Sequence, residues 1–234
     1  MAKKKNKRLQ QIARKLVVLT NPKSIVSEQF RTTRTNINFS MPDGELKTLL
    51  ITSSLQGEGK STSSANLSCL FAQEGKKVLL IDADMRKPTV HYTFHITNTI
   101  GLSNILTKKV TVQEATKETY IENLSIITSG PIPPNPAELL SGKMMDEMLE
   151  GLKEQYDIIV FDAPPLLSVT DAQILANKSD GTVLVINAGS TDKDSALKAK
   201  ELLQVSKAKV LGTILNNFKL EKDHYYYHYY GNGE

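Results

Sequence analysis

The fold is decided by an apolar run that passes directly into a glycine-rich loop. Residues 48–62 read Thr48-Leu49-Leu50-Ile51-Thr52-Ser53-Ser54-Leu55-Gln56-Gly57-Glu58-Gly59-Lys60-Ser61-Thr62, and a stretch with helical spacing continues to residue 74. A tight loop between a buried strand and a helix gathers backbone N–H groups at the helix N-terminus, where the helix dipole also favours anions. This stretch therefore predicts a phosphate-binding loop.

The loop ends in Gly59-Lys60-Ser61, which is the end of a P-loop motif. In such a loop the lysine supplies charge to the outer phosphates of a nucleotide, and the Ser61 hydroxyl can ligate Mg²⁺. Ser54 stands where the plain motif has its first glycine. The residues predicted to bind the nucleotide here are Gly57, Glu58, Gly59, Lys60, Ser61 and Thr62.

Apolar runs rich in β-branched residues recur along the chain and predict strands at residues 48–53, 77–82, 124–128, 157–162, 182–187 and 209–215. Helical spacing predicts helices at 61–74, 137–155 and 192–206, with Gly75 as a left-handed C-cap and Thr191 with Asp194 as a capping box. The proline-rich residues 130–136 predict a stiff loop. Continuous apolar strands separated by helices predict an α/β fold, with a mostly parallel sheet covered by helices on both faces.

Two of the predicted strands end in carboxylates. Asp82 and Asp84 follow Val78–Ile81, and Asp162 follows the apolar run at 158–161. The carboxyl ends of parallel strands share one edge of an open α/β sheet, which is where ligands bind. A nucleotide held by a P-loop needs Mg²⁺, and carboxylates at neighbouring strand ends hold that ion, often through water. An aspartate after a strand can also be a simple turn former.

Length and composition favour one globular domain. The chain has 234 residues, of which 40% are hydrophobic and 23% charged, and Cys69 is its single cysteine. One thiol forms no internal disulfide, and no apolar run approaches the roughly 20 residues of a membrane span, so a cytoplasmic protein is expected.

Residues 1–27 hold eight Lys or Arg and no acid. We predict a basic arm at residues 1–20, a folded domain at 21–220 and a tail at 221–234. The arm could meet nucleic acid or an anionic membrane, or be solvated.

Three motifs together resemble the Walker A, A′ and B motifs of the bacterial tyrosine kinases, which are P-loop NTPase-like. They are residues 54–61, Asp82-Ala83-Asp84-Met85-Arg86 and Phe161-Asp162-Ala163-Pro164-Pro165. The resemblance is to the capsule and exopolysaccharide type, in which the kinase is a separate cytoplasmic chain. Glu28-x-x-Arg31-x-x-Arg34, the loop at 129–136 and a tyrosine cluster near the C-terminus agree with it.

The resemblance implies a role for each site residue. Lys60 would bind the β- and γ-phosphates of ATP. Asp82 would be the candidate base for the incoming tyrosine hydroxyl, with Asp84 as its metal-side or orienting partner, and the resemblance leaves the division of roles between the two open. Arg86 would neutralise charge on the transferred group, and Asn216 is a candidate contact for the nucleotide base or a turn residue. The implied catalytic residues are Asp82, Asp84, Lys60 and Arg86, and the implied Mg²⁺ site consists of Ser61, Asp82, Asp84 and Asp162.

The resemblance also implies partners and regulation. The expected phosphorylation sites are Tyr225, Tyr226, Tyr227, Tyr229 and Tyr230, each modified in trans within a ring held partly by Glu28, Arg31 and Arg34. A transmembrane activator would recruit the chain to the inner face of the membrane, and a protein tyrosine phosphatase would act on it. The expected role is control of capsular or exopolysaccharide synthesis, with no nucleic acid as a partner.

Two other functions compete with a tyrosine kinase. A partitioning-type ATPase would use ATP to assemble on DNA or a membrane, but such proteins carry a lysine five positions before the P-loop lysine, where this chain has Leu55. A regulatory subunit would bind ATP without transferring its phosphoryl group. The tyrosine-rich tail and Leu55 favour the kinase.

Overall fold

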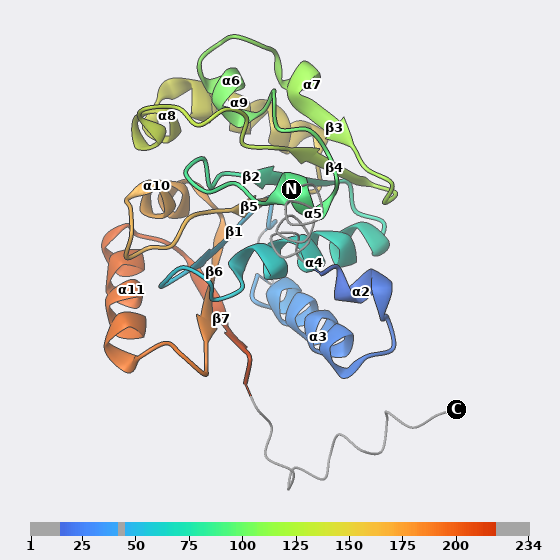
Figure 1. The fold of residues 1–234 in the computed structure, drawn as a ribbon, viewed down its shortest axis with the longest axis vertical. Coiled ribbons are helices and arrows are strands. Elements are labelled where there is room, and N and C mark those ends of the chain that lie inside the picture. The colour runs from blue at the N-terminus through green and yellow to red at the C-terminus, as the bar shows by residue number, and fades with distance from the viewer. Residues whose placement is uncertain (1–14, 42–44, 219–234) are drawn as a thin grey trace, which may run out of the picture.

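A computed structural model describes residues 15–41 and 45–218. Its centre is a seven-stranded sheet with the order β3-β4-β2-β5-β1-β6-β7 (Figure 1). The strands are β1 (Thr48–Ser53), β2 (Val78–Asp82), β3 (Thr116–Glu118), β4 (Leu124–Ile127), β5 (Ile158–Asp162), β6 (Gly181–Asn187) and β7 (Val210–Asn216). All neighbouring strands are parallel except β3 and β4. The predicted α/β fold with a mostly parallel sheet is therefore confirmed.

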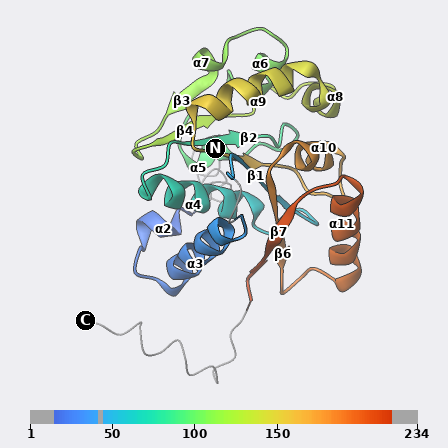
Figure 2. The ribbon, with the colours of Figure 1, turned by 180° about the vertical axis from the view of Figure 1, so that it is seen from behind.

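Helices cover both faces of this sheet (Figures 1 and 2). One face carries α2 (Val17–Thr20), α3 (Ile25–Phe39), α4 (Lys60–Gln73) and α5 (Val90–Thr93). The other carries α6 (Leu102–Leu106), α7 (Val112–Ala115), α8 (Pro136–Ser141), α9 (Lys143–Gln155), α10 (Asp171–Lys178) and α11 (Lys193–Val205). The sheet thus separates two hydrophobic cores.

The central strands show why the apolar runs are continuous rather than alternating. Leu49 and Ile51 of β1 pack into the core beneath α4, whereas Leu50 between them packs into the opposite core. All three side chains are fully buried. Successive side chains of a strand point to opposite faces, so a strand covered on both sides needs an apolar residue at every position.

The structure corrects several local predictions. The helix expected at 137–155 is two helices, because the backbone is extended at Gly142, and it begins one residue earlier, at Pro136. Asp192, and not Thr191, caps α11, since its side chain accepts a hydrogen bond from Ser195 N. The antiparallel edge strand β3 was not predicted. The stiff loop predicted at 130–136 ends at residue 135, because Pro136 is the first residue of α8, whereas the left-handed Gly75, with φ of 90°, agrees with the prediction.

The N-terminal boundary of the folded body lies earlier than residue 20. Leu16 and Val18 are buried, and α2 contacts both α3 and α4. Residues 16–20 therefore belong to the body and not to the predicted arm. In the part of the chain that the structure describes, no helix is long and apolar enough to cross a membrane. Residues 1–14 of the predicted arm and the tyrosines at 225–230 lie outside the described residues.

Candidate active site

The phosphate loop joins β1 to α4 at the carboxyl edge of the sheet. Gly57 and Gly59 adopt left-handed backbone conformations, with φ of 88° and 102°, and Gly59 is the N-cap of α4. A side chain is strained in this conformation, which explains glycine at both positions. The loop forms one wall of a pocket of about 380 Å³. The pocket is lined by Gln56, Gly57, Gly59, Lys60, Ser61, Thr62, Asp84, Arg86, Lys87, Thr89, Pro164, Pro165, Ser168, Val169 and Asn216.

Lys60 connects the three motifs at the floor of this pocket. Its Nζ lies 2.9 Å from Asp84 Oδ2 and 3.4 Å from Asp162 Oδ1, and the lysine is 8% exposed. Burial lowers the pKa of Lys60, but the carboxylates of Asp162 and Asp84 outweigh burial and raise the pKa overall. Residues from three separate turns of the sequence thus meet, as predicted.

Asp82 and Asp162 lie side by side on β2 and β5, beneath the pocket. Asp82 Oδ2 accepts hydrogen bonds from Thr89 N and Val90 N at 3.1 and 3.0 Å, whereas Asp82 Oδ1 and Asp162 Oδ2 are buried without a partner. Burial and the nearby Asp162 raise the pKa of Asp82 well above its ordinary value, and burial also raises the pKa of Asp162.

The two acidic residues of the second motif occupy different places. Asp84 lines the pocket, and its Oδ1 accepts a hydrogen bond of 3.0 Å from Lys87 N. Asp82 is fully buried and does not line the pocket. Asp84 is therefore the one of the two that faces the pocket, while Asp82 keeps one carboxylate oxygen without a hydrogen-bond donor.

The donor set fits Mg²⁺ held jointly with a nucleotide. Within residues 15–41 and 45–218, no group of three or more His, Cys, Asp or Glu is arranged to hold a metal by itself. Mg²⁺ in nucleotide sites is usually held by one or two carboxylates, water and the phosphates. The unpartnered oxygen of Asp162 and the nearby Ser61 hydroxyl, 3.4 Å from Lys60 Nζ, suit that arrangement.

Arg86 lines the pocket but is committed to a partner that the sequence analysis missed. Its Nε and Nη2 donate to the two carboxylate oxygens of Asp171 at 2.9 and 3.0 Å. Asp171 is fully buried and is the first residue of α10. A two-pronged pair fixes the plane of the guanidinium group. Asp171 therefore holds Arg86 at the pocket wall, and no local motif marks it.

Glu58 and Asn216 brace the phosphate loop. The Glu58 side chain is 2% exposed and turns away from the pocket, which it does not line. Asn216 lines the pocket and its Nδ2 donates to the Glu58 carbonyl at 2.8 Å. The Glu58 side chain is used within the loop, and the predicted contact of Glu58 with the nucleotide stays a prediction for its backbone N–H group.

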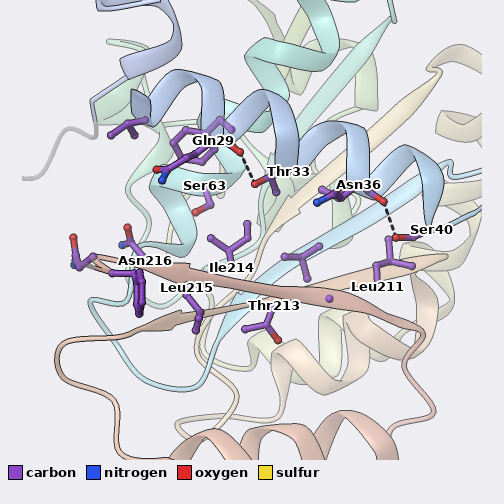
Figure 3. Close-up of a pocket in the computed structure, with 17 residues that line it drawn as sticks. Gln29, Thr33, Asn36, Ser40, Ser63, Leu211, Thr213, Ile214, Leu215 and Asn216 are labelled. Carbon is purple, nitrogen blue, oxygen red and sulfur yellow. Dashed lines mark hydrogen bonds between the residues drawn. The ribbon is translucent and has the colours of Figure 1, made fainter. Parts of the chain in front are cut away.

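The three residues predicted to hold a ring lie on α3. Arg31 Nη1 pairs with Glu28 Oε2 at 2.8 Å, and Arg34 Nη1 donates to the Leu70 carbonyl of α4 at 3.0 Å. Both arginines thus have partners within the same chain. The opposite side of α3 forms a groove of about 620 Å³ with β7, and Asn216 lines both this groove and the pocket (Figure 3).

Comparison with known proteins agrees with this site. A family model described as an AAA domain matches residues 46–207. Tyrosine-protein kinase YwqD of Bacillus subtilis is 53% identical over 99% of this chain and 97% of its own length. Tyrosine-protein kinase Wzc of Salmonella typhimurium is 33% identical over 92% of this chain, which corresponds to 30% of Wzc.

Solved structures give the same result. The chimerical protein CapA2B2 superposes with a TM-score of 0.85 and 42% identity, covering 89% of this chain and 93% of its own. The septum site-determining protein MinD of Pyrococcus horikoshii reaches a TM-score of only 0.64 at 25% identity, covering 75% of this chain and 72% of its own. The kinase motifs and their geometry therefore outweigh the partitioning-type alternative, and the chain belongs to the bacterial tyrosine-protein kinases.

Proposed function

We propose that the chain transfers the γ-phosphoryl group of ATP to tyrosine and acts on its own C-terminal cluster in trans. Lys60 carries this proposal, because its ammonium group joins Asp84 and Asp162 at the floor of a pocket walled by the phosphate loop. On binding ATP, Lys60 exchanges these partners for the β- and γ-phosphates. The released carboxylates then face the phosphate end of the nucleotide.

The reaction forms a bond between the tyrosine oxygen and the γ-phosphorus and breaks the bond from that phosphorus to the bridging oxygen, so that ADP leaves. The phenol proton passes to a carboxylate of the second motif, in which Asp84 lines the pocket and Asp82 keeps an oxygen without a hydrogen-bond donor. A tyrosine hydroxyl has a pKa of about 10, and a base with a raised pKa accepts its proton more readily near neutral pH. Mg²⁺, when bound, neutralises charge on the phosphates.

Arg86 stabilises the transferred group. The Asp171 carboxylate accepts hydrogen bonds from Nε and from one Nη2 hydrogen of Arg86. The other guanidinium N–H groups remain for phosphoryl oxygens. In a loose transition state most of the catalysis comes from positioning and charge neutralisation. Lys60 and Arg86 supply the positive charge in this proposal.

The names of the relatives support a role in regulation, and we extend the proposal to that role. We infer control of capsular or exopolysaccharide synthesis, activation by a membrane protein, reversal by a tyrosine phosphatase, and a homo-oligomeric ring. The match to 30% of Wzc supports a partner, because a longer relative joins a kinase region to further sequence. Recruitment to the inner face of the membrane is part of the same proposal.

Mass spectrometry of the tail tests the transfer. Wild-type protein incubated with ATP and Mg²⁺, with and without the cytoplasmic segment of the candidate activator, should gain phosphotyrosine at residues 225–230. Lys60→Met should gain none, whereas Lys143→Met changes a lysine on α9 whose side chain is 89% exposed and should match wild type. Bound ADP with an unmodified tail in the presence of the activator would favour the regulatory subunit.

A further inference from the structure

The carboxylate of Glu58 is buried beneath the phosphate loop and is surrounded by donors. It accepts hydrogen bonds from Ser54 Oγ at 2.9 and 3.1 Å and from Leu55 N at 2.8 Å. Thr191 Oγ1 also donates to Glu58 Oε1. A buried carboxylate is expensive unless such donors satisfy it. Glu58 therefore ties the start of the loop to its end and reaches outside it.

Thr191 brings in a second segment of the chain. It lies in the connection between β6 and α11, next to the N-cap residue Asp192. Its N donates to the Asn187 carbonyl at 2.9 Å, and its Oγ1 accepts from Asn187 N at 3.3 Å. The hydroxyl is thus anchored to the end of β6 on one side and contacts Glu58 on the other.

This arrangement compensates for Ser54 at the first glycine position of the motif. The Ser54 hydroxyl donates to the Glu58 carboxylate, and neither residue lines the pocket. A loop that contains two left-handed glycines loses much conformational entropy when it is fixed. Contacts that fix it before the nucleotide arrives increase affinity, because binding no longer has to order the loop.

We propose that Glu58 and Thr191 form a latch by which the β6–α11 connection holds the phosphate loop in its nucleotide-binding shape. Both are positioning residues for the proposed phosphotransfer, and the inference rests on that function. The Asn216 contact with the Glu58 carbonyl supports the same loop from β7. The latch acts on the nucleotide before transfer, so its loss weakens binding and leaves turnover at saturating ATP nearly unchanged.

Equilibrium binding of ADP, followed with a fluorescent analogue, tests the latch. Thr191→Val keeps the shape of the side chain and removes the donor, and should weaken ADP binding about tenfold, as expected for a lost hydrogen bond to a charged group. KM for ATP should rise by the same factor, with kcat within about twofold of wild type. Thr191→Ser should restore binding, and Ser190→Ala, in the same connection, should behave as wild type.

A double variant separates coupling from a general loss of stability. Removing the Thr191 hydroxyl has no further effect if the side chain at position 58 has no acceptor, so Glu58→Ala with Thr191→Val should bind no more weakly than the more severe single variant. Three results would overturn the latch. They are effects of the two substitutions on ADP affinity that multiply in the double variant, wild-type affinity in Thr191→Val, and failure of Thr191→Ser to restore binding. Wild-type protein that binds ADP but modifies no tyrosine would count against the proposed function and not against the latch.

Discussion

At the scale of single residues, the two glycines of the phosphate loop make different demands. Both have positive φ, but a Cβ at Gly59 would lie 2.2 Å from Asn216 Nδ2, whereas a Cβ at Gly57 would meet nothing within 4 Å. Gly57→Ala should therefore cost about 1 kcal/mol of backbone strain. Gly59→Ala should cost more and weaken ADP binding strongly, because Asn216 must move. Thermal unfolding and ADP titration measure the two effects.

The source of the extra cost can be isolated. Replacing Asn216 by Ala removes the atom that the new Cβ would meet. Gly59→Ala combined with Asn216→Ala should then be more stable than expected from the sum of the two single variants. If the losses of stability in the two single variants simply add in the double variant, backbone strain alone explains why glycine is needed at position 59.

The buried carboxyl group of Asp82 is expected to make the folded protein less stable at neutral pH. Below the pKa of about 3.9 of an unfolded aspartate, the carboxyl is neutral in both the folded and unfolded states. As pH rises, the unfolded state loses its proton first, because burial raises the folded pKa of Asp82, and the folded protein is destabilised until that pKa is passed. Asp82→Asn should therefore unfold at a higher denaturant concentration than wild type at pH 7.

The advantage of that variant should disappear near pH 3.5, where wild type is neutral at this position. Kinase activity should be lost at every pH if Asp82 is the base. Asp84→Asn is the variant with which the stability and activity of Asp82→Asn are compared, because Asp84 lines the pocket and pairs with Lys60. A variant of Asp82 that is less stable at neutral pH would contradict the argument.

The sequence predicted those site residues whose motifs are local. Lys60, Asp84 and Asp162 follow strands, and parallel strands bring their ends to one edge, so their meeting could be predicted. Asp171 and Thr191 could not be found in this way. Asp171 meets Arg86 across 85 positions, and Thr191 meets Glu58 across 133. Such contacts depend on how loops pack, for which a sequence without a motif gives no signal.

At the scale of elements, periodicity predicted buried strands well and short or interrupted elements poorly. All six predicted strands are present, because an apolar run is required in a strand covered on both faces. The strand β3 is only three residues long, reads Thr-Lys-Glu and is partly exposed, so it carries no apolar signal. The break between α8 and α9 was missed because the apolar spacing continues across Gly142. The spacing of apolar residues carries no information about the extended backbone at that glycine.

The helix α3 offers a test that separates stability from assembly. Arg34 donates to the Leu70 carbonyl in the last turn of α4, where cations are favoured, and is mostly shielded from solvent. Arg34→Ala should lower the free energy of unfolding by about 1 kcal/mol, even in the monomer. Arg31→Ala should cost less than about 0.5 kcal/mol, because its hydrogen bonds to Glu28 and to the Pro22 carbonyl are both exposed.

Urea denaturation at concentrations where light scattering reports a monomer measures both values. Arg31→Ala is consequently the better probe of the proposed ring, since a change in size would not follow from a weakened fold. Equal destabilisation by the two variants would show that the contact with α4 contributes nothing.

At the scale of the whole molecule, the folded body extends toward the N-terminus as far as residue 15, whose carbonyl accepts a hydrogen bond of 2.9 Å from Asn66 Nδ2. Leu16 and Val18 are 5% and 1% exposed, and burying each side chain contributes about 1.5–3 kcal/mol. Deleting residues 1–14 should leave the melting temperature unchanged, whereas deleting residues 1–20 should lower it markedly. Differential scanning calorimetry measures this difference, and vesicle binding of the shorter deletion tests whether the arm contacts a membrane.

The sheet ends differently on its two sides. One side closes with the short antiparallel β3, and the other ends at β7, where Val210 and Leu215 are 43% and 56% exposed. Within the described residues, no further strand pairs with β7. An open edge with apolar side chains is a template for strands from other molecules. Concentrated stocks should therefore turn cloudy on storage, and Leu215→Lys should delay the turbidity by repelling neighbouring copies.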